Sequence, residues 1–584
     1  MKYEWSLNCL YKGYEDENFQ KDFESIDNRI KALKEVVDKA TEKTHLEGLL
    51  SIIKELETFE TFVTNLYSYL ALRSSVNTTE EETSRYTTIF QKKYTQMIPI
   101  NAKMYAYIAS IESLEQLIKE NEALWEYEFF LLDIKESQAH RLDEKVEEVI
   151  GKMDLTGGRA WEKLFDYLTS TLKVDYKGDV VTLPEIRNKA NDEDQEVRKE
   201  AYEAELRSYE KIKDSIAFAL NNIKSQVSMV TELRGYESPL DMTLKQSNMK
   251  RETLDAMFSS MRKYLPKFHE YLKAKASMLG HKNGLPWYDL TAPVGEFNKK
   301  YSIEEAKEYL VSAFSHFSED MVMLIERAFN EEWIDFLSRE GKVGGAFCLA
   351  VPSKKQSRIL TNYNYNFDSI NTLAHELGHA YHNLQIENNS SLNQDYSMPV
   401  AETASTFNEN VIIMKAILEG TKEEKLSLIE NLLSNTTQII CDIYSRFLFE
   451  DTVFHRCEEE FLTADRLKEI MIQAQKEAYG DGLDENYLHP YMWCCKGHYY
   501  SSSLSYYNFP YAFGGLFSMG LYAMFEEEGE SFVPKYKELL NKTPIKTVED
   551  VAKMVGIDLT TEDFWDKSLS YFATLIDEFI SLSK

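Results

Sequence analysis

The chain has 584 residues, of which 43% are hydrophobic and 28% are charged, and its formal net charge is −31 at pH 7. A chain of this length exceeds the size at which a single hydrophobic core stops growing, so we expect more than one lobe. The acidic balance argues against nucleic-acid binding, which needs clustered Lys and Arg facing phosphate. Two interpretations of the charge stay open: an acidic surface that keeps the protein in solution, or an acidic cleft that favours cationic peptides.

The start of the chain and its cysteines predict a cytoplasmic protein. Residues 1–17 contain no apolar segment of the kind that a signal peptide requires. No apolar run approaches the roughly 18 residues needed to cross a membrane, so no membrane partner is expected. The six cysteines include no CxxC pair, which indicates reduced thiols. The sequence leaves the oligomeric state open.

The first third of the chain is predicted to be a helical bundle. No Pro occurs before Pro99, and no Gly occurs between Gly48 and Gly151. Apolar residues recur at the i, i+3, i+4 and i+7 positions that bury one side of a helix. The clearest stripes are Leu33, Val36, Val37 and Ala40, then Leu46, Leu49, Leu50 and Ile53. We place a domain boundary between residues 187 and 188 and expect further helix over about 191–232.

The clearest β signal lies in the middle of the chain. Gly344, Gly345, Ala346 and Phe347 precede residues 362–367, where aromatic and amide side chains alternate with the period of two of a strand. We predict a hairpin or small sheet immediately before the next helix. The predicted fold class is therefore mainly α, with one small β-sheet.

Residues 371–382 contain the sequence HExxH, with its histidines at His375 and His379. Successive residues of a helix rotate by about 100°, so these two side chains lie about 40° apart and can bind one metal ion. We expect Asp368 or Ser369 to cap the helix. The opposite face is apolar, with Leu373, Leu377, Ala380 and Leu384. The pattern predicts a zinc site on this helix.

A catalytic zinc site needs three protein ligands and one position for water. Glu402, which follows His379 by 23 residues, is the predicted third ligand. Pro399 suits the start of a second helix that would carry Glu402. Glu387 and Asp395 remain weaker alternatives.

Two further residues are predicted to support the site without binding the ion. His382 lies seven residues after His375, or about 10 Å along a helix, which is too far for both to bind one ion. Metzincins use a third His, but they require Gly where this chain has His382 and His where it has Gln385. Glu409 shares a helix face with Glu402, so we place it beside the site as well.

HELGH at residues 375–379, together with AETASTFNE at residues 401–409, resembles the M3 family of metallopeptidases, which includes thimet oligopeptidases and oligoendopeptidase F. Residues 506–514, YYNFPYAFG, are most similar to the bacterial oligoendopeptidase F branch. The resemblance implies a zincin-like fold with two lobes around a deep cleft. It implies a helical N-terminal region, 1–187, that forms part of the cleft wall, and a catalytic domain over 188–584. It also implies short peptide substrates, and we expect one Zn²⁺ per chain.

The expected mechanism assigns a role to each polar residue near the zinc. Zinc lowers the pKa of a bound water to about 7. Glu376, next to a ligand, is predicted to be the general base that passes the water proton to the leaving amine. The resemblance implies that His498 and one of the tyrosines after it contact the substrate oxygen. We favour Tyr507, then Tyr506, and we assign Tyr511 to substrate binding.

Gly344, Gly345 and Ala346 are predicted to bind substrate, because small residues let an extended peptide pair with a sheet edge. A turn needed only for chain reversal is the competing explanation for these glycines. The leading hypothesis is an oligoendopeptidase acting on internal bonds. A carboxypeptidase-like exopeptidase using the same zinc, or a catalytically silent peptide-binding protein, remains an alternative.

Overall fold

The computed structural model describes residues 2–295, 297 and 299–584, and most of them are helical, as predicted. They group into two compact units, each built from three separate segments of the chain. Unit 1 comprises Met1–Ala139, Asn298–Ile412 and Met524–Gly556, and unit 2 comprises His140–Phe297, Ile413–Ala523 and Ile557–Lys584. The boundary that we placed at 187/188 falls inside a segment of unit 2, so it stays a prediction about domains and does not separate these units.

The N-terminal segment of unit 1 is a helical bundle, and the burial of its apolar stripes confirms the predicted periodicity. Leu33, Val37 and Ala40 are buried against Leu49 and neighbouring residues in one hydrophobic cluster. A capping box, with reciprocal bonds between an N-cap Thr and the Glu three residues later, starts the second helix. The helices of this segment are α1 (Glu17–Lys39), α2 (His45–Val76), α3 (Glu81–Tyr94), α4 (Met97–Ala109), α5 (Leu114–Glu120) and α6 (Glu128–Ala139).

The rest of unit 1 packs helices around a three-stranded sheet. The strands are β3 (Ile334–Asp335), β4 (Phe347–Val351) and β5 (Gln356–Leu360), in the order β3-β5-β4. β4 pairs with β5 in antiparallel register, and β3 pairs with β5 in parallel. The helices are α14 (Ile303–Phe314), α15 (Glu319–Asn330), α16 (Phe367–Ile386), α17 (Met398–Ala401), the first part of α18 (Thr403–Glu419), α24 (Phe532–Lys542) and α25 (Val548–Met554).

The small sheet before the motif helix is confirmed, but one of its strands was assigned to the wrong residues. Of residues 362–367, which alternate aromatic and amide side chains, none belongs to a strand: 362–366 follow β5, and Phe367 begins α16. Tyr365 has a positive φ of 57°, which interrupts any strand. Asn362 donates to the carbonyl oxygen of Gly345 at 2.8 Å, and Asn366 caps α16. Two of the asparagines therefore bond to backbone groups: Asn362 to the turn before β4, and Asn366 to the first turn of α16.

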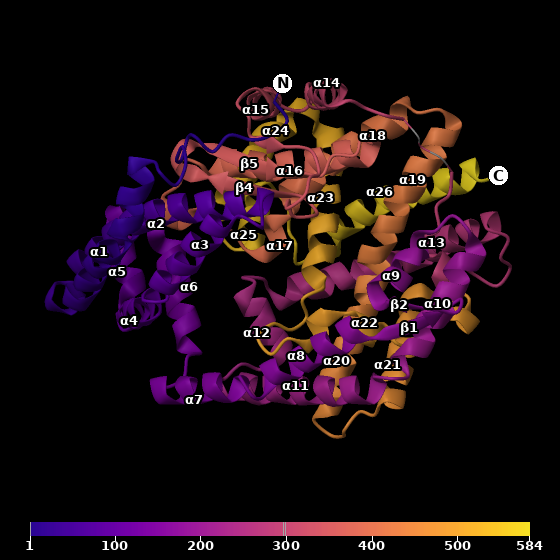
Figure 1. Ribbon diagram of the computed structural model, residues 1–584, viewed down its shortest axis with the longest axis horizontal. Coiled ribbons are helices and arrows are strands. Elements are labelled where there is room, and N and C mark those ends of the chain that lie inside the picture. Colours follow the sequence, from indigo (N-terminus) through magenta and orange to yellow (C-terminus); the bar gives the residue numbers. More distant parts are fainter. Residues whose placement is uncertain (1, 296, 298) are drawn as a thin grey trace. The chain divides into compact units, whose positions relative to one another are not determined.

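Helix α16 carries the HExxH sequence and packs against β4 and β5 (Figure 1). Its N-cap is Asn366, whose side-chain oxygen accepts from the backbone N–H of Ser369 at 3.0 Å, so the predicted cap at Asp368 or Ser369 is wrong by two or three residues. The predicted apolar face is confirmed, since Leu373, Leu377 and Ala380 are buried. α16 thus buries one face and leaves the other for polar side chains.

Unit 2 is also built mainly of helices, with one β-hairpin, β1 (Lys173–Tyr176) and β2 (Asp179–Thr182). The predicted helical stretch near 191–232 forms α10 and α11. A π-helical segment, Gln438–Asp442, joins α19 to α20. The helices are α7 (Glu144–Asp154), α8 (Gly158–Thr171), α9 (Leu183–Asn188), α10 (Gln195–Tyr209), α11 (Lys213–Leu233), α12 (Pro239–Gln246), α13 (Arg251–Met278), α19 (Lys422–Thr437), α20 (Ile443–Cys457), α21 (Ala464–Tyr479), α22 (Met492–Cys495), α23 (Phe509–Glu528), which starts in this unit, and α26 (Glu562–Leu582).

Within the described part of the chain, no helix combines the length and the apolar composition needed to cross a membrane.

Candidate metal centre

Two histidines of α16 and one glutamate converge in unit 1. The Nε2 atoms of His375 and His379 lie 3.3 and 3.5 Å from the same carboxylate oxygen, Oε2 of Glu402. One potential ligand atom from each of the three residues lies within 4.8 Å of the others. Two imidazoles and a carboxylate are a donor set that a catalytic zinc ion takes, with a fourth position left for water. The chemistry of these donors therefore fits zinc.

Glu402 occupies a break between two helices. α17 ends at Ala401 and α18 begins at Thr403, so the single helix that we expected from Pro399 is interrupted at the predicted ligand. The hydroxyl of Ser405 donates to Oε2 of Glu402 at 2.8 Å and holds the carboxylate in place. Although burial raises the pKa of Glu402, hydrogen bonding and charge from the two histidines lower it to about 2. This carboxylate is therefore ionised at neutral pH.

Glu409 binds the other ring nitrogen of His375. Its Oε1 lies 2.5 Å from Nδ1 of His375, and its Oε2 accepts from the side-chain amide of Asn371 at 2.9 Å. A carboxylate in this position keeps the proton on Nδ1 and leaves Nε2 free as a metal ligand. Burial lowers the pKa of His375, but Glu402 and Glu409 outweigh it and raise the value to about 10. The imidazole thus sits in an environment that stabilises positive charge at Nε2.

Glu376 differs from Glu402 in its surroundings. It is only 5% exposed, and its Oε2 has no hydrogen-bond partner within the described structure. Burial raises its pKa to about 7; the charges of Glu402 and Glu409 also raise it, and His375 lowers it. A carboxyl group with a pKa near neutral can accept and return a proton at physiological pH, which is the property that a general base needs.

His382 lies in the interior, and its ring is engaged by residues other than the converging ligands. Its Nε2 is 2.7 Å from Oγ1 of Thr543, and its ring stacks on Tyr396 with centroids 4.0 Å apart. Burial lowers its pKa to about 3, so the ring is neutral. The other rival ligands, Glu387 and Asp395, line a separate cavity of about 600 Å³ beside α2 and β4. Of these candidates, the group near His375 includes only Glu402.

The residues predicted to contact the substrate oxygen belong to unit 2. The ring of His498 lies 5.8 Å from that of Tyr507, whose hydroxyl accepts from Tyr511 at 3.0 Å. Tyr506 is 3% exposed, and its hydroxyl donates to Asp451 at 2.9 Å. Tyr506 is thus bonded inside unit 2, and the order in which we favour Tyr507 over Tyr506 stays a prediction. The contact of this cluster with the metal centre stays a prediction, because the ligands belong to unit 1.

Comparison with known sequences identifies the chain. The model described as Peptidase family M3 matches residues 189–571, which is more than half of the 584 residues. A second model, described as Oligopeptidase F, matches residues 109–173. The chain belongs to peptidase family M3. It is therefore a metal-dependent peptidase, and the predicted family is confirmed.

Relatives of this M3 peptidase extend over nearly its whole length. Oligopeptidase PepF of Bacillus subtilis is 25% identical over 598 residues, covering 98% of this chain and 86% of PepF. The oligoendopeptidase F homologue of Lactococcus lactis is 24% identical and covers 99% and 96% of the two chains. A peptidase structure from Chlamydophila abortus superposes with a TM-score of 0.87 at 20% identity, covering 99% and 98%. Oligoendopeptidase F from Enterococcus faecium gives 0.69 at 18% identity, covering 97% and 99%, so the fold is shared.

Sequence reasoning missed the residues that bring α18 of the M3 peptidase close to α16. A Cβ atom on Gly378 would lie 2.4 Å from the carbonyl oxygen of Ala404, so only glycine permits this approach. The side chain of Asn408 donates to the carbonyl oxygen of Ala374 at 3.0 Å across the same contact. The signal in the sequence was a glycine inside the motif helix, which indicates close packing.

The predicted substrate-binding residues precede an edge strand. Among the residues that the structure describes, β4 pairs with β5 alone, so its other edge carries backbone groups without a strand partner. Gly344 and Gly345 have open space where a side chain would begin, and Gly345 has a positive φ of 78°. Ala346 connects this turn to β4. The positive φ of Gly345 supports the turn explanation, and substrate binding by Gly344, Gly345 and Ala346 stays a prediction.

Proposed function

We propose that this M3 peptidase is a zinc-dependent oligoendopeptidase that cuts internal bonds of short peptides and binds one Zn²⁺ per chain. The observation that carries the proposal is the convergence of His375, His379 and Glu402 on one point, beside a buried Glu376. The relatives named oligoendopeptidase F, which match almost the whole chain, support the endopeptidase assignment. Its cysteines are unpaired, which supports action in a reducing compartment, the cytoplasm.

The residues of the site have three roles: they bind the metal, transfer a proton and orient a ligand. When bound to the two histidines and Glu402, zinc supplies a Lewis acid and lowers the pKa of its water to about 7. Glu376 takes the proton of the attacking water and delivers it to the leaving amine, which its pKa near 7 permits. Glu409 holds Nδ1 of His375 and so fixes the direction in which Nε2 points.

We assign the stabilisation of the developing oxyanion to His498 and Tyr507, with Tyr506 as the weaker candidate. Each such donor is worth about 2.7–4 kcal/mol in the transition state. Tyr511, which donates to Tyr507, orients that phenol and contacts the substrate. The peptide pairs with the free edge of β4 next to residues 344–346, where small residues allow backbone to approach backbone.

Replacing Glu376 with Gln tests the proposal. The variant keeps its zinc ligands and its shape but cannot accept a proton, so we expect turnover to fall by about 10²–10⁴-fold with zinc content unchanged. Zinc is measured by atomic absorption and turnover with an internally quenched fluorescent peptide. Glu387→Gln, at the C-terminal end of the same helix, is the matched control and should keep full activity. Full activity of Glu376→Gln, or wild type that takes up no zinc, contradicts the proposal.

An exopeptidase is the second candidate, because Metallocarboxypeptidase 1 of Trypanosoma cruzi shares the fold with a TM-score of 0.53 at 14% identity. Peptides blocked at both ends distinguish the two. An endopeptidase cleaves them at internal bonds, whereas a carboxypeptidase needs a free C-terminus. Absence of cleavage of every doubly blocked peptide, together with cleavage of free ones, would assign the exopeptidase. If the protein binds zinc but cleaves neither blocked nor free peptides, it is a catalytically silent peptide-binding protein.

A further inference from the structure

A second polar cavity lies wholly within unit 2 and is separate from the zinc ligands. It measures about 210 Å³, and its wall includes residues of α9, α10, α13, α20 and the segment that leads to His498. Aromatic side chains form part of the wall, among them Tyr202, Trp287 and Tyr288. Its charged residues are Arg187, Arg198, Arg446, Lys496, Glu205 and Asp442. Four cations thus face two carboxylates, in a protein whose net charge is −31.

Ion pairing accounts for three of the four cations. Arg198 pairs with the fully buried Asp289 at 2.8 Å, outside the set that lines the cavity. Arg446 pairs with Asp442, and Nε of Arg187 lies 3.4 Å from Oε1 of Glu205. The ammonium group of Lys496 has no hydrogen-bond or ion-pair partner within the described structure. The cavity therefore holds one positive charge that no neighbouring carboxylate pairs with.

The surroundings of Lys496 disfavour its positive charge. Burial lowers the pKa of Lys496; Asp442 raises it, and the nearby charges of Arg446 and Arg187 lower it further. Lys496 is therefore repelled by two guanidinium groups, although each of these is paired with a carboxylate of its own. A bound anion would remove this repulsion, because it would pair with Lys496 and lie close to both guanidinium groups.

Other polar groups of the wall also lack partners. His489 is 2% exposed, lines the cavity, and its Nδ1 makes no hydrogen bond within the described structure. Nε of Arg446 is likewise buried without a partner. The π-helical segment Gln438–Asp442 supplies Gln438 and Asp442 to the wall. Buried donors without partners are costly, and π-helical turns are frequent at functional sites.

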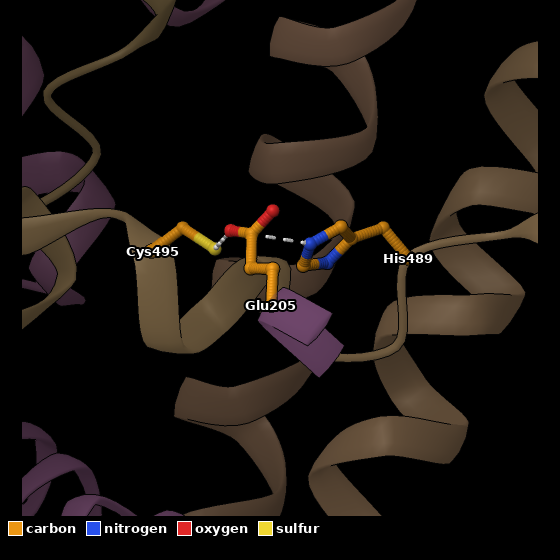
Figure 2. Close-up of side chains that lie close together, drawn as sticks. All are labelled: Glu205, His489 and Cys495. Atoms are coloured by element: carbon orange, nitrogen blue, oxygen red, sulfur yellow. Dashed lines mark hydrogen bonds and ion pairs between the residues drawn. The ribbon is translucent and has the colours of Figure 1, made fainter. Parts of the chain in front are cut away.

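Glu205 and His489 of the wall, with Cys495 beside them, have the composition of a metal site (Figure 2). The neighbouring charge of Arg187 opposes a metal ion. Oε1 of Glu205 lies 3.6 Å from Nε2 of His489 and 3.7 Å from Sγ of Cys495. The same oxygen accepts from the hydroxyl of Tyr209 at 2.9 Å and pairs with Arg187. Burial raises the pKa of the Cys495 thiol to about 12, so it carries its proton. A divalent cation here would lie next to the guanidinium of Arg187, whose positive charge repels it.

We propose that this cavity binds a small oxyanion, a carboxylate or a phosphate, through Lys496 and Arg187. A planar guanidinium and an ammonium are the usual partners of such groups. The volume of about 210 Å³ limits the ligand to a small molecule or to the end of a peptide. The site requires neither zinc nor peptide cleavage, so it goes beyond the proposed function. The cavity lies close to His498, the candidate oxyanion donor, because the charges of Arg446 and Lys496 in its wall act on that residue. Burial, followed by these two charges, lowers the pKa of His498 to about 3.

Anion titration of the full-length, zinc-loaded protein tests the proposal. Melting temperature is followed against phosphate, acetate and chloride at constant ionic strength, for wild type, Lys496→Met and Lys282→Met. Lys282 is exposed and outside the cavity, so its variant is the matched control. We expect a saturable rise with phosphate or acetate in wild type and the control. In Lys496→Met, half-saturation should need at least tenfold more anion, while melting without anion stays equal or rises.

The outcomes separate the sources of the oxyanion and the competing explanations. If the rise in melting temperature saturates with acetate but not with phosphate, the ligand of the cavity is a carboxylate. If it saturates with phosphate but not with acetate, the ligand is a phosphate. Equal responses to chloride, no saturation, or an unchanged Lys496→Met overturn the proposal. Arg187→Gln, with binding measured by calorimetry, serves if Lys496→Met does not fold, and it too should weaken binding at least tenfold. A loss of one zinc equivalent in Cys495→Ser would show a metal site in place of the anion site.

Discussion

Two glutamates of the metal centre have opposite electrostatic environments. Burial raises the pKa of both, yet Glu402 ends at about 2 and Glu376 at about 7. The difference arises because two imidazoles lie next to Glu402, whereas Glu376 has one carboxylate oxygen without any hydrogen bond. Carboxylates with pKa values pushed apart in this way suit different roles, an ionised ligand and a base that titrates near neutral pH.

Removal of Glu402 and removal of His382 are expected to have separate effects. Glu402→Ala deletes a ligand, so zinc affinity should fall by more than the roughly 10–100-fold that losing an outer hydrogen-bonding partner costs. His382→Ala removes a ring that stacks on Tyr396, so it should reduce folding stability and change zinc affinity little. Equilibrium dialysis with zinc, beside thermal unfolding, measures both. Loss of zinc from His382→Ala but not from Glu402→Ala would exchange their roles.

His382 also predicts a pH dependence of stability. Burial lowers its folded-state pKa to about 3, against about 6.5 in the unfolded chain. Below pH 6.5 the unfolded state therefore binds a proton that the folded state does not. The stabilisation is complete above that pH and is lost as pH falls towards 3. Between pH 7.5 and 5 this amounts to about 2 kcal/mol.

His382→Asn should remove this contribution. Urea unfolding of the metal-free proteins at both pH values is expected to show a smaller acid-induced loss of stability in the variant, by about 2 kcal/mol. His316→Asn, at an exposed position of the same unit, is the control and should follow wild type. Equal pH dependence in wild type and His382→Asn would mean that the ring is not buried as a neutral group.

At the scale of elements, the metal centre depends on the contact between α16 and the start of α18. The first element supplies two ligands, and the third lies at the helix break just before α18. Their separation is set by backbone contact at Gly378 and by the bond from Asn408 to Ala374. β4 and β5 cover another side of α16, so the helix is fixed by a sheet and by helices together. The ligand geometry is therefore a property of packing between elements.

Gly378→Ala should disturb this contact. The added methyl would lie 2.4 Å from the carbonyl oxygen of Ala404, and overpacking of this kind costs about 1–3 kcal/mol. Because Ala404 follows Glu402 closely, zinc affinity should fall as well. Gly151→Ala is the control, since Gly151 lies in a helix with open space around it and should gain up to about 1 kcal/mol. An unchanged melting temperature and zinc affinity in Gly378→Ala would contradict the packing argument.

For the whole molecule, the main features are the discontinuous units and the acidic charge. Both units are assembled from three segments, so each core forms only when residues distant in the chain meet. A net charge of −31 gives the protein a negative field that attracts cations over about a Debye length, roughly 8 Å at physiological salt. Peptides approach through this field before any specific contact forms.

The negative net charge predicts that salt changes the kcat/KM of cationic and anionic peptides in different ways. At low salt, a peptide flanked by lysines should have a higher kcat/KM than the same core flanked by glutamates. Raising sodium chloride from about 20 to 300 mM should reduce the advantage several-fold, since it shortens the Debye length from above 10 Å to below 8 Å. A neutral glutamine-flanked peptide is the control for effects of salt on the enzyme itself. If kcat/KM changes equally with salt for all three peptides, the acidic charge keeps the protein in solution and does not select substrates.

Local patterns in the sequence were sufficient for the fold class, the bundle stripes and the motif helix. Leu33, Val37 and Leu49 are buried as predicted, because helical period depends on a few successive residues. The same local reasoning misplaced a strand at residues 362–366 and the cap of α16. Asn362 bonds to the backbone of Gly345, and Asn366 bonds to the backbone of Ser369; residue alternation reveals neither contact.

The sequence by itself determined the family, the donor types and the spacing of His375, His379 and Glu402. Only the tertiary structure decided what surrounds them: the carboxylate of Glu409 on Nδ1 of His375, and the burial that raises the pKa of Glu376. It also decided that the cations of the second cavity, which come from separate helices, meet around Lys496. Helical phase is a short-range property that a sequence displays, whereas pKa values and unpaired charges depend on neighbours that folding brings from distant segments.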